Sequence, residues 1–183
     1  MARALVPLAT GCEELEAVTI IDLLRRAGVE VVTAGLAAGP VTASRGVRLL
    51  PDRLLDEVLE EEFDIVILPG GQPGADNLVR DPRVTALLQR MNEAGRYTAA
   101  ICAAPKVLAS AGILDGHRAT GYPGVLDQVI APNMEISTEP VVRDGHVITS
   151  RGPGTAMEFA LELIEILRGS ACRQVVESAL VRS

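Results

Sequence analysis

Short apolar runs alternate with amphipathic stretches along the chain, and this pattern predicts buried strands separated by helices. Residues 3–8, 29–34, 64–71 and 97–101 are short runs rich in aliphatic side chains, which is typical of strands buried on both faces of a sheet. Between the first two runs, apolar residues recur at helical spacing, and Gly28 stands where a C-terminal cap belongs. The first third of the chain therefore predicts a strand, a helix and a second strand.

The rest of the chain continues this alternation with helices, two hairpins and one further strand. Cys102 falls between the strand that ends at residue 101 and the next helix, and the last helix is expected to open on a capping box formed by Thr155 and Glu158. The remaining expected elements are a hairpin at 40–51 that turns near Arg45–Gly46, an acidic helix at 54–61, helices at 82–92 and 103–111, a strand near 117–121, and a hairpin at 139–149.

This order of elements predicts an α/β fold with an open, doubly wound and mostly parallel sheet that carries helices on both faces. Binding sites in such sheets form at the carboxyl ends of the strands. No linker or internal repeat interrupts the 183 residues, so we expect one domain over residues 1–183.

Composition narrows the classes of function. Aromatic residues make up 2% of the chain, so the core is expected to consist of Val, Ile, Leu and Ala. The net charge is −7 and the basic residues are scattered, which excludes the clustered Lys and Arg of a nucleic-acid binder. The N-terminus lacks the pattern of a signal peptide, and no run approaches the roughly 18 apolar residues of a membrane span, so no membrane association is expected.

The three cysteines, Cys12, Cys102 and Cys172, are odd in number, widely spaced and without a CxxC motif. This spacing favours neither a disulfide framework nor a metal site, and we expect a reduced, cytoplasmic setting. Cys12 is interpreted as a small packing residue, and Cys172 is given no role.

Cys102 is the strongest candidate for chemistry. It follows an apolar strand and precedes two alanines and a proline at a helix start, which resembles a nucleophile elbow. The N–H groups of a helix N-terminus favour a thiolate, so a lowered pKa is expected for Cys102. The alternative is an inert cysteine buried in the core.

Two other strand ends are expected to meet Cys102. The strand ending at Pro69 is followed by Gly70 and Gly71, and the N–H groups of Gly71 and Ala103 could stabilise an oxyanion. A dinucleotide-binding loop is a weak alternative, because the glycine spacing is wrong and the first strand is followed by glutamates. Among these, Glu16 could reach the crevice and donate a proton to the sulfur, with its pKa raised by burial and by the thiolate.

The neighbouring Glu13 and Glu14 are interpreted as partners of the helix dipole that face water. The two histidines, His117 and His146, are expected at the surface, although a papain-like Cys–His pair with one of them stays open.

Six motifs are spread over nearly the whole chain: GCEELEAV (11–18), DLLRRAGVEV (22–31), SRGV (44–47), DIVILPGG (64–71), AAICAAP (99–105) and SRGPGTAMEFAL (150–161). In this combination of motifs the sequence resembles the ThiJ/PfpI superfamily, in the branch of the Parkinson-disease protein deglycase and its bacterial YajL relatives.

The resemblance implies a flavodoxin-like sandwich and a homodimer. It makes Cys102 an oxidation-sensitive nucleophile, Glu16 its protonated partner, and Gly71 and Ala103 the amide donors, with Gly70 beside them. Arg45 and Arg151 match arginines near the dimer interface and the site, and ordinary ion pairing is the alternative for each.

The chain departs from relatives of this superfamily at two positions. Tyr122 stands where the Parkinson-disease protein has a histidine, so that proton-transfer role is unfilled, turnover is expected to be slower, and Tyr122 could simply pack. Ala103 stands where protease-like members have a histidine, which argues against peptidase activity.

The resemblance implies a cysteine-dependent enzyme, without cofactor, that acts on methylglyoxal, glyoxal or their early glycation adducts. The alternative is an oxidative-stress sensor or redox-regulated chaperone that uses the same cysteine. Both functions depend on Cys102, so the sequence leaves this choice open.

Overall fold

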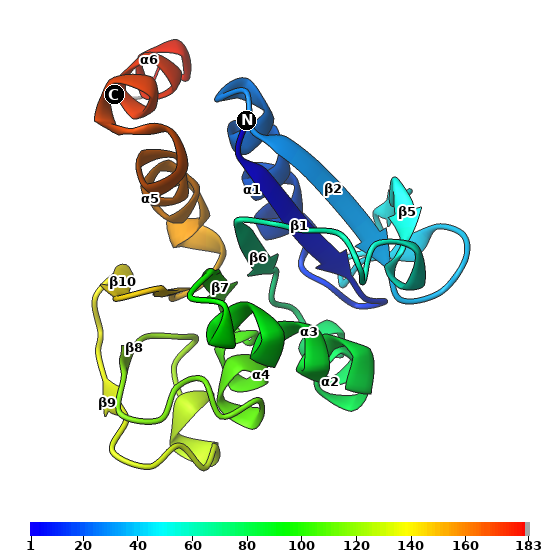
Figure 1. Cartoon of the computed structure of the whole chain (residues 1–183), viewed down its shortest axis with the longest axis vertical. Coiled ribbons are helices and arrows are strands. Elements are labelled where there is room, and N and C mark those ends of the chain that lie inside the picture. The colour runs from blue at the N-terminus through cyan, green and yellow to red at the C-terminus, as the bar shows by residue number, and fades with distance from the viewer. Residues whose placement is uncertain (182–183) are drawn as a thin grey trace.

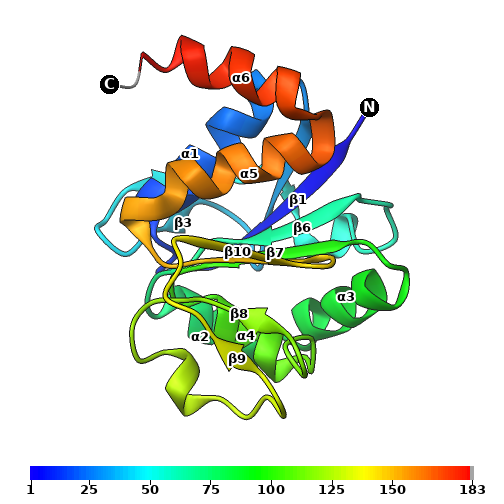
Figure 2. The ribbon, with the colours of Figure 1, turned by 90° about the vertical axis from the view of Figure 1, so that its left-hand side faces the viewer.

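The protein folds into three layers, with a central sheet between two groups of helices (Figures 1 and 2). A computed structural model describes residues 1–181. The sheet has seven strands in the order β10-β11-β7-β6-β1-β2-β5, and only β10 is antiparallel to its neighbour. Its strands are β1 (Arg3–Leu8), β2 (Glu30–Gly35), β5 (Arg53–Leu54), β6 (Ile65–Leu68), β7 (Tyr97–Ile101), β10 (Val141–Asp144) and β11 (Val147–Ser150).

Helices cover both faces of the sheet, as Figure 2 shows. One face carries α1 (Glu14–Arg26), α5 (Ala156–Arg168) and α6 (Ser170–Ala179), and the other carries α2 (Gly74–Arg80), α3 (Pro82–Glu93) and α4 (Pro105–Ser110). The predicted α/β class and the mostly parallel sheet are therefore confirmed.

The central strands are buried on both faces, which explains their continuous apolar sequences. All four residues of β6 are fully buried, and its register with β1 sets Leu5 opposite Val66. Such β-branched and aliphatic side chains pack well on a parallel sheet covered by helices. The core is accordingly a single cluster built almost without aromatic residues.

Two small sheets lie outside the main one. The predicted hairpin is present as β3 (Val41–Thr42) and β4 (Arg48–Leu49), with Arg45 and Gly46 in its turn. The strand expected near 117–121 exists as β8 (Arg118–Ala119), but it pairs in parallel with β9 (Glu135–Ile136) and does not join the main sheet.

The predicted helix over residues 54–61 is wrong. The chain forms only a single 3-10 turn, Leu55–Glu57, directly after β5. The Glu57 carboxylate accepts hydrogen bonds from the Leu54 N–H and the Arg53 side chain, which closes the turn, while Leu55 is buried. Tertiary packing here overrides the local helical pattern.

Three further helix details differ from the prediction. Residues 74–80, for which no element was predicted, form α2, and the helix expected from residue 103 begins at Pro105. Thr155 makes no side-chain capping bond, so the capping box is wrong. Its hydroxyl instead lies 2.7 Å from the Ser150 hydroxyl and accepts from the Gly152 N–H, which ties the start of α5 to the end of β11.

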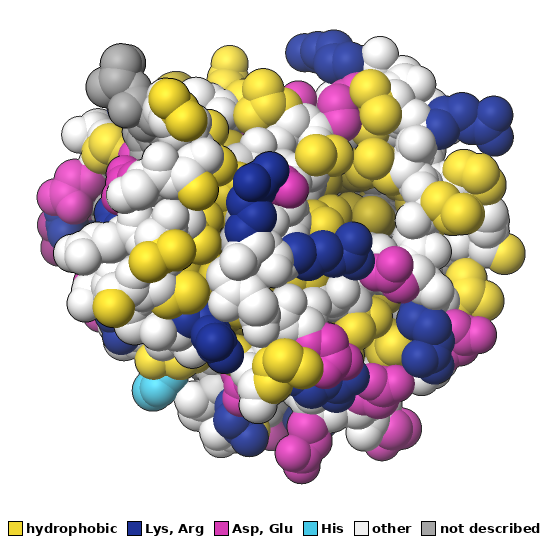
Figure 3. All heavy atoms as spheres, turned by 90° about the horizontal axis from the view of Figure 1, so that it is seen from above, with side chains coloured by type: hydrophobic (Ala, Val, Ile, Leu, Met, Phe, Trp, Pro, Cys, Tyr) yellow, Lys and Arg dark blue, Asp and Glu magenta, His cyan; other side chains and the backbone are white. Residues whose placement is uncertain are grey.

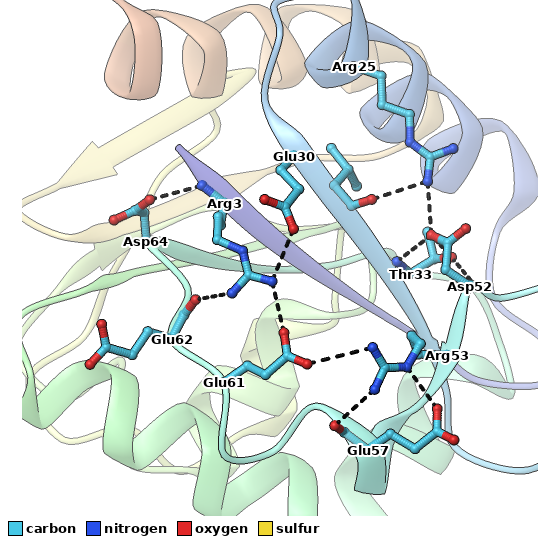
Figure 4. Close-up of polar contacts among 11 residues, drawn as sticks. Arg3, Arg25, Glu30, Thr33, Asp52, Arg53, Glu57, Glu61, Glu62 and Asp64 are labelled. Atoms are coloured by element: carbon cyan, nitrogen blue, oxygen red, sulfur yellow. Dashed lines mark hydrogen bonds and ion pairs between the residues drawn. The ribbon is translucent and has the colours of Figure 1, made fainter. Parts of the chain in front are cut away.

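Ion pairs link the strands at one edge of the sheet (Figure 4). Arg3 pairs with Glu30 at 3.0 Å and with Glu61 at 2.8 Å, and Glu61 also contacts Arg53 at 3.7 Å. Figure 3 shows that charges of both signs are interspersed on the face seen from above. Within residues 1–181, no helix is long and apolar enough to cross a membrane.

Candidate functional site

The loops that follow β1, β6 and β7 meet at the carboxyl edge of the sheet. The Glu13 N–H donates to the Gly70 carbonyl at 2.9 Å, which joins the first two loops. The Gly70 N–H donates to Glu16 Oε2 at 2.8 Å, which brings α1 to the same point. Cys102 follows β7 directly, so the three strand ends predicted to converge do so.

Cys102 occupies a left-handed backbone conformation with φ of +63°. Its N–H donates to the Ser150 carbonyl at 3.0 Å, and its carbonyl accepts from the Tyr122 N–H at 2.8 Å. A non-glycine residue rarely adopts this conformation, and it persists only where the surroundings enforce it. The sharp strand-to-helix turn predicted at Cys102 is therefore present, and it leaves the side chain 8% exposed.

Glu16 is the most unusual carboxyl group of the site, because it is 0% exposed. Its Oε2 atom accepts from Gly70, whereas its Oε1 atom is buried without a hydrogen-bond partner among the described residues. Burial raises the pKa of Glu16 to about 7, against the opposing effect of hydrogen bonds from Gly70 and Cys102. A buried oxygen without a partner is tolerated better in a neutral carboxyl than in a carboxylate.

The pKa of Cys102 is raised, which contradicts the lowered value expected from the helix N-terminus. Burial and the adjacent charge of Glu16 raise the pKa of the thiol to about 12, although hydrogen bonds from the N–H groups of Gly71 and Ala103 lower it. Desolvation and a neighbouring carboxylate thus outweigh the amides. The sequence could not predict how deeply the sulfur would be buried beside Glu16.

Cys102 and Glu16 together behave as one acid with two protons. Their proton losses are coupled, with the pKa of Glu16 raised to about 7 and that of Cys102 raised to about 12. Between these values the pair holds one proton, and because the pKa of the thiol is the higher of the two, this proton lies mainly on the sulfur. The reactive form is the one in which the carboxyl keeps the proton and the sulfur is a thiolate.

Gly70 and Gly71 are required by close packing around this pair. A Cβ atom on Gly70 would lie 2.6 Å from Cys102 Cβ and 2.8 Å from Glu16 Oε2. A Cβ atom on Gly71, whose φ is +91°, would lie 2.4 Å from the Glu13 nitrogen. Any side chain at either position would push the loop away from the sulfur.

An open pocket of about 320 Å³ leads to the sulfur. The lining residues that the sequence identified are Arg45, Gly71, Cys102, Ala103 and Tyr122. Sequence reasoning missed Gln72, Ser44, Val125 and Pro153, and it gave Glu13 no place in the pocket. The only signal for Gln72 is its position directly after Gly71. The others come from loops whose approach depends on tertiary packing.

Glu14 is buried, so its interpretation as a water-facing residue is wrong. Its carboxylate accepts hydrogen bonds from the Ser44 hydroxyl and from the Arg45 and Val47 N–H groups, at 2.9 to 3.4 Å. Burial raises the pKa of Glu14, but these hydrogen bonds and its own N–H have the larger, opposite effect. The pKa of Glu14 is therefore lower than its usual value. Glu14 therefore holds the hairpin turn, and with it Arg45, beside the pocket.

Tyr122 and Arg151 lie at the outer side of the site. Tyr122 is 53% exposed and lines both the Cys102 pocket and a neighbouring pocket of about 270 Å³. Arg151 lines only the neighbouring pocket, where its Nη1 atom donates to the Thr138 carbonyl at 3.3 Å. The structure thus brings Tyr122 to Cys102, and it places Arg151 one pocket away.

Neither histidine pairs with Cys102. His117 Nδ1 lies 3.1 Å from Asp144 Oδ2, and the His146 ring packs against Tyr97 with centroids 5.0 Å apart. A papain-like Cys–His pair is therefore absent. Cys12 is buried in the core, where burial raises its pKa to about 11, as expected of a packing residue. In residues 1–181, no cluster of three or more His, Cys, Asp or Glu side chains could hold a metal ion.

Comparisons with known proteins find chains that are similar in sequence and in fold. "Protein dj-1beta" from Drosophila melanogaster is 45% identical over 179 residues, which covers 97% of this chain and 96% of that protein. "Glutathione-independent glyoxalase DJR-1.2" from Caenorhabditis elegans is 40% identical over 157 residues, or 86% of this chain and 83% of that one. The structure "Toxoplasma gondii DJ-1, oxidized" matches with a TM-score of 0.95 and 40% identity, covering all of both chains.

The model of the DJ-1/PfpI family matches residues 2–166, which include every candidate site residue. The resemblance drawn from the sequence motifs is thereby confirmed: this chain belongs to the DJ-1/PfpI family.

Proposed function

We propose that this protein is a cysteine-dependent enzyme that converts small reactive carbonyls, such as methylglyoxal and glyoxal, into hydroxy acids. The single observation that carries the proposal is the Glu16 carboxyl, buried beside Cys102 with a pKa near 7. A group that titrates near neutral pH can both donate and accept a proton during one turnover. The glyoxalase name of the Caenorhabditis elegans relative supports the same chemistry.

The first step is addition of the Cys102 thiolate to the aldehyde carbon. The new C–S bond forms as the carbonyl electron pair moves to oxygen, and the N–H groups of Gly71 and Ala103, which already point at the sulfur, stabilise the oxyanion. Glu16 then transfers its proton to this oxygen. The product is a neutral hemithioacetal on Cys102, with Glu16 left as carboxylate.

The second step moves a proton between the two carbons of the substrate. The Glu16 carboxylate removes the proton from the carbon bonded to sulfur and returns it to the neighbouring carbon, while the hydroxyl proton moves to the oxygen of that neighbouring carbon, which leaves a hydroxy thioester. Water attacks this thioester, one of its protons passes to Glu16, the C–S bond breaks, and the hydroxy acid leaves with the Cys102 thiolate and the protonated Glu16 restored. The balance is one carbonyl compound plus one water, so no oxidant or cofactor is needed.

Early glycation adducts are a second substrate class for the same site. They carry the same reactive carbon attached to an amine or a thiol, and the pocket of about 320 Å³ is open to the surface. Tyr122 lies beside the pocket in place of a histidine, so Glu16 carries the proton transfers alone. We therefore expect slower turnover than in relatives that have the histidine.

The alternative function is an oxidative-stress sensor or redox-regulated chaperone. Here the Cys102 thiolate attacks a peroxide, the S–O bond forms as the O–O bond breaks, and a second peroxide gives the sulfinic acid. The unpartnered Oε1 atom of Glu16 favours this reading, since it could donate a hydrogen bond to a sulfinate oxygen. The oxidised state named for the Toxoplasma gondii structure supports it.

We also propose that the protein forms a homodimer through α1 and the β3–β4 hairpin. Exposed aliphatic side chains gather on these two elements, namely Leu15, Val18, Val47 and Leu50. The Glu14 carboxylate bonds to the turn of the hairpin and so holds it beside α1. Exposed apolar groups of this kind mark protein interfaces, and Arg45 would then lie between the interface and the pocket.

The proposed function is tested by following the conversion of methylglyoxal to lactate by the purified protein. The wild type is expected to produce lactate, Cys102→Ala to produce none above the uncatalysed rate, and Glu16→Gln to lose at least about a hundredfold in kcat. Lactate production by Cys102→Ala at the wild-type rate would overturn the enzyme function. Oxygen addition to Cys102 by peroxide, in protein that makes no lactate, would favour the sensor.

A further inference from the structure

A polar cluster of three side chains lies behind the Cys102 pocket and is not used by the chemistry above. It consists of Gln72, which lines the pocket, Asp76 on α2, and Lys106 on α4. Lys106 is the only lysine in the chain. We propose that Lys106 is a positioning residue that, together with Asp76, fixes Gln72 and so holds the Gly71 N–H toward the sulfur.

Both ends of the Gln72 amide are held in this cluster. With the amide oriented by its hydrogen-bonding partners, Nε2 donates to Asp76 Oδ2 at 2.7 Å and Oε1 accepts from Lys106 Nζ at 2.7 Å. Lys106 also pairs directly with Asp76. The three side chains thus form a closed ring of contacts, in which each member has two partners.

The cluster connects the two segments that supply the amide donors. Gly71 immediately precedes Gln72 in the loop after β6, whereas Ala103 lies at the turn that leads into α4, on which Lys106 sits. Helix α2 packs against α4. The contact between Gln72 and Lys106 therefore sets the separation of the Gly71 and Ala103 N–H groups, which an oxyanion site requires to be well defined.

Lys106 is partly buried, so its pair with Asp76 is more shielded than an ordinary surface pair. Its side chain is 18% exposed, and that of Asp76 is 41% exposed. A shielded pair is screened less by solvent and salt.

The test uses two readouts on the full-length protein: the rate of Cys102 alkylation by iodoacetamide, and kcat and KM for methylglyoxal. In Lys106→Met, both the alkylation rate and kcat are expected to fall about tenfold, with KM within about twofold of wild type. The expected loss is smaller than that for deletion of an oxyanion donor, because the Gly71 N–H is displaced and not removed. Lys106→Arg, which can still pair with Asp76, is expected to keep at least half of both rates.

Gln72→Leu removes the side-chain amide of Gln72 and leaves the Lys106–Asp76 pair. It therefore tests the proposal even if Lys106→Met does not fold. It should show the same losses, and the double variant should lose no more than either single variant, because one contact is removed in all three. The matched control is Arg96→Met, which removes the surface pair between Arg96 and Asp64 and should leave both readouts unchanged.

Rates within about twofold of wild type in Lys106→Met, or losses that multiply in the double variant, would overturn the proposal. The kinetic readout rests on the proposed function, whereas the alkylation readout does not. If the wild type makes no lactate, the proposed function fails, and the alkylation rates still decide whether Lys106 positions the amide.

Discussion

Gly70 and Cys102 are in contact so close that a Cβ atom on Gly70 would lie 2.6 Å from Cys102 Cβ. The same atom would lie 2.8 Å from Glu16 Oε2, so a methyl group at Gly70 would separate the thiol from its acid. We predict that Gly70→Ala lowers stability by about 1–3 kcal/mol and lowers Cys102 alkylation at least about tenfold. Urea unfolding and iodoacetamide kinetics measure the two effects.

The control for this substitution is Gly154→Ala. Gly154 has no neighbour within 4 Å of an added Cβ atom, and its φ is not positive. Both measurements should therefore match the wild type. Equal effects of the two substitutions would show that the contact between Gly70 and Cys102 is unimportant.

The left-handed conformation of Cys102 predicts an unusual order of stability among its variants. Because φ is +63°, glycine fits the position without strain, and we expect Cys102→Gly to be about 1 kcal/mol more stable than Cys102→Ala. In the interior of α3 the order should be reversed, so Ala86→Gly should lose about 1 kcal/mol. Thermal or urea unfolding of the three variants checks this, and an alanine variant at position 102 as stable as the glycine variant would refute backbone strain.

The raised pKa of Glu16 predicts a characteristic dependence of stability on pH. Between 4.5, the value in the unfolded chain, and about 7, the folded protein keeps a proton that the unfolded chain has released. The unfolded state binds fewer protons in this range, so the contribution of Glu16 to stability falls as the pH rises. The difference in unfolding free energy between wild type and Glu16→Gln should decrease by about 3 kcal/mol over this range.

Glu14→Gln is the matched control, because the contribution of Glu14 to stability changes with pH in the opposite direction. The folded pKa of Glu14 is lowered, so its contribution is present above 4.5 and is lost as the pH falls through the folded value. Urea unfolding of the three proteins at a series of pH values measures both trends. A wild-type and a Glu16→Gln protein with parallel pH profiles would contradict the raised pKa.

The proposed dimer predicts that a charge on its apolar surface produces monomers. Val18→Glu or Val47→Glu places a carboxylate among exposed aliphatic side chains, and sedimentation should then report a mass near 19.3 kDa, half that of the wild type. Ile130→Glu is the control, since Ile130 is equally apolar and 90% exposed but lies outside α1 and the hairpin. A wild type that sediments as a monomer would exclude the dimer.

Local patterns were sufficient to predict the elements that position the site. The strand at residues 97–101 has the predicted bounds, and Gly28, with φ of +69°, follows α1 as the expected cap. Buried strands and terminal glycines are encoded locally, because periodicity and backbone freedom depend on nearby residues. The grouping of Cys102, Glu16 and Gly71 followed from the rule that sites form where parallel strands end.

Long-range packing determined what the sequence could not predict. The contact between Gln72 and Lys106 joins residues far apart in the chain, and nothing in either local sequence indicates it. The pKa of Cys102 likewise depends on a balance between burial, Glu16 and two N–H groups, and only the assembled site fixes that balance. The residue types in the sequence identified Cys102, Glu16 and the glycines as members of the site, whereas packing decided that the pKa of Cys102 is raised and not lowered.

The most direct test of the account is the pH dependence of Cys102 alkylation in wild type and Glu16→Gln, both in a Cys172→Ala background. The wild-type rate is predicted to rise with a midpoint near pH 7 and then to stay level to about pH 10, because the pair loses one proton and shares the other. Glu16→Gln, which has no shared proton, should continue to rise above pH 8. A wild-type rate that rises about tenfold per pH unit through pH 8, with the midpoint of 9.0 typical of a free thiol, would contradict the account.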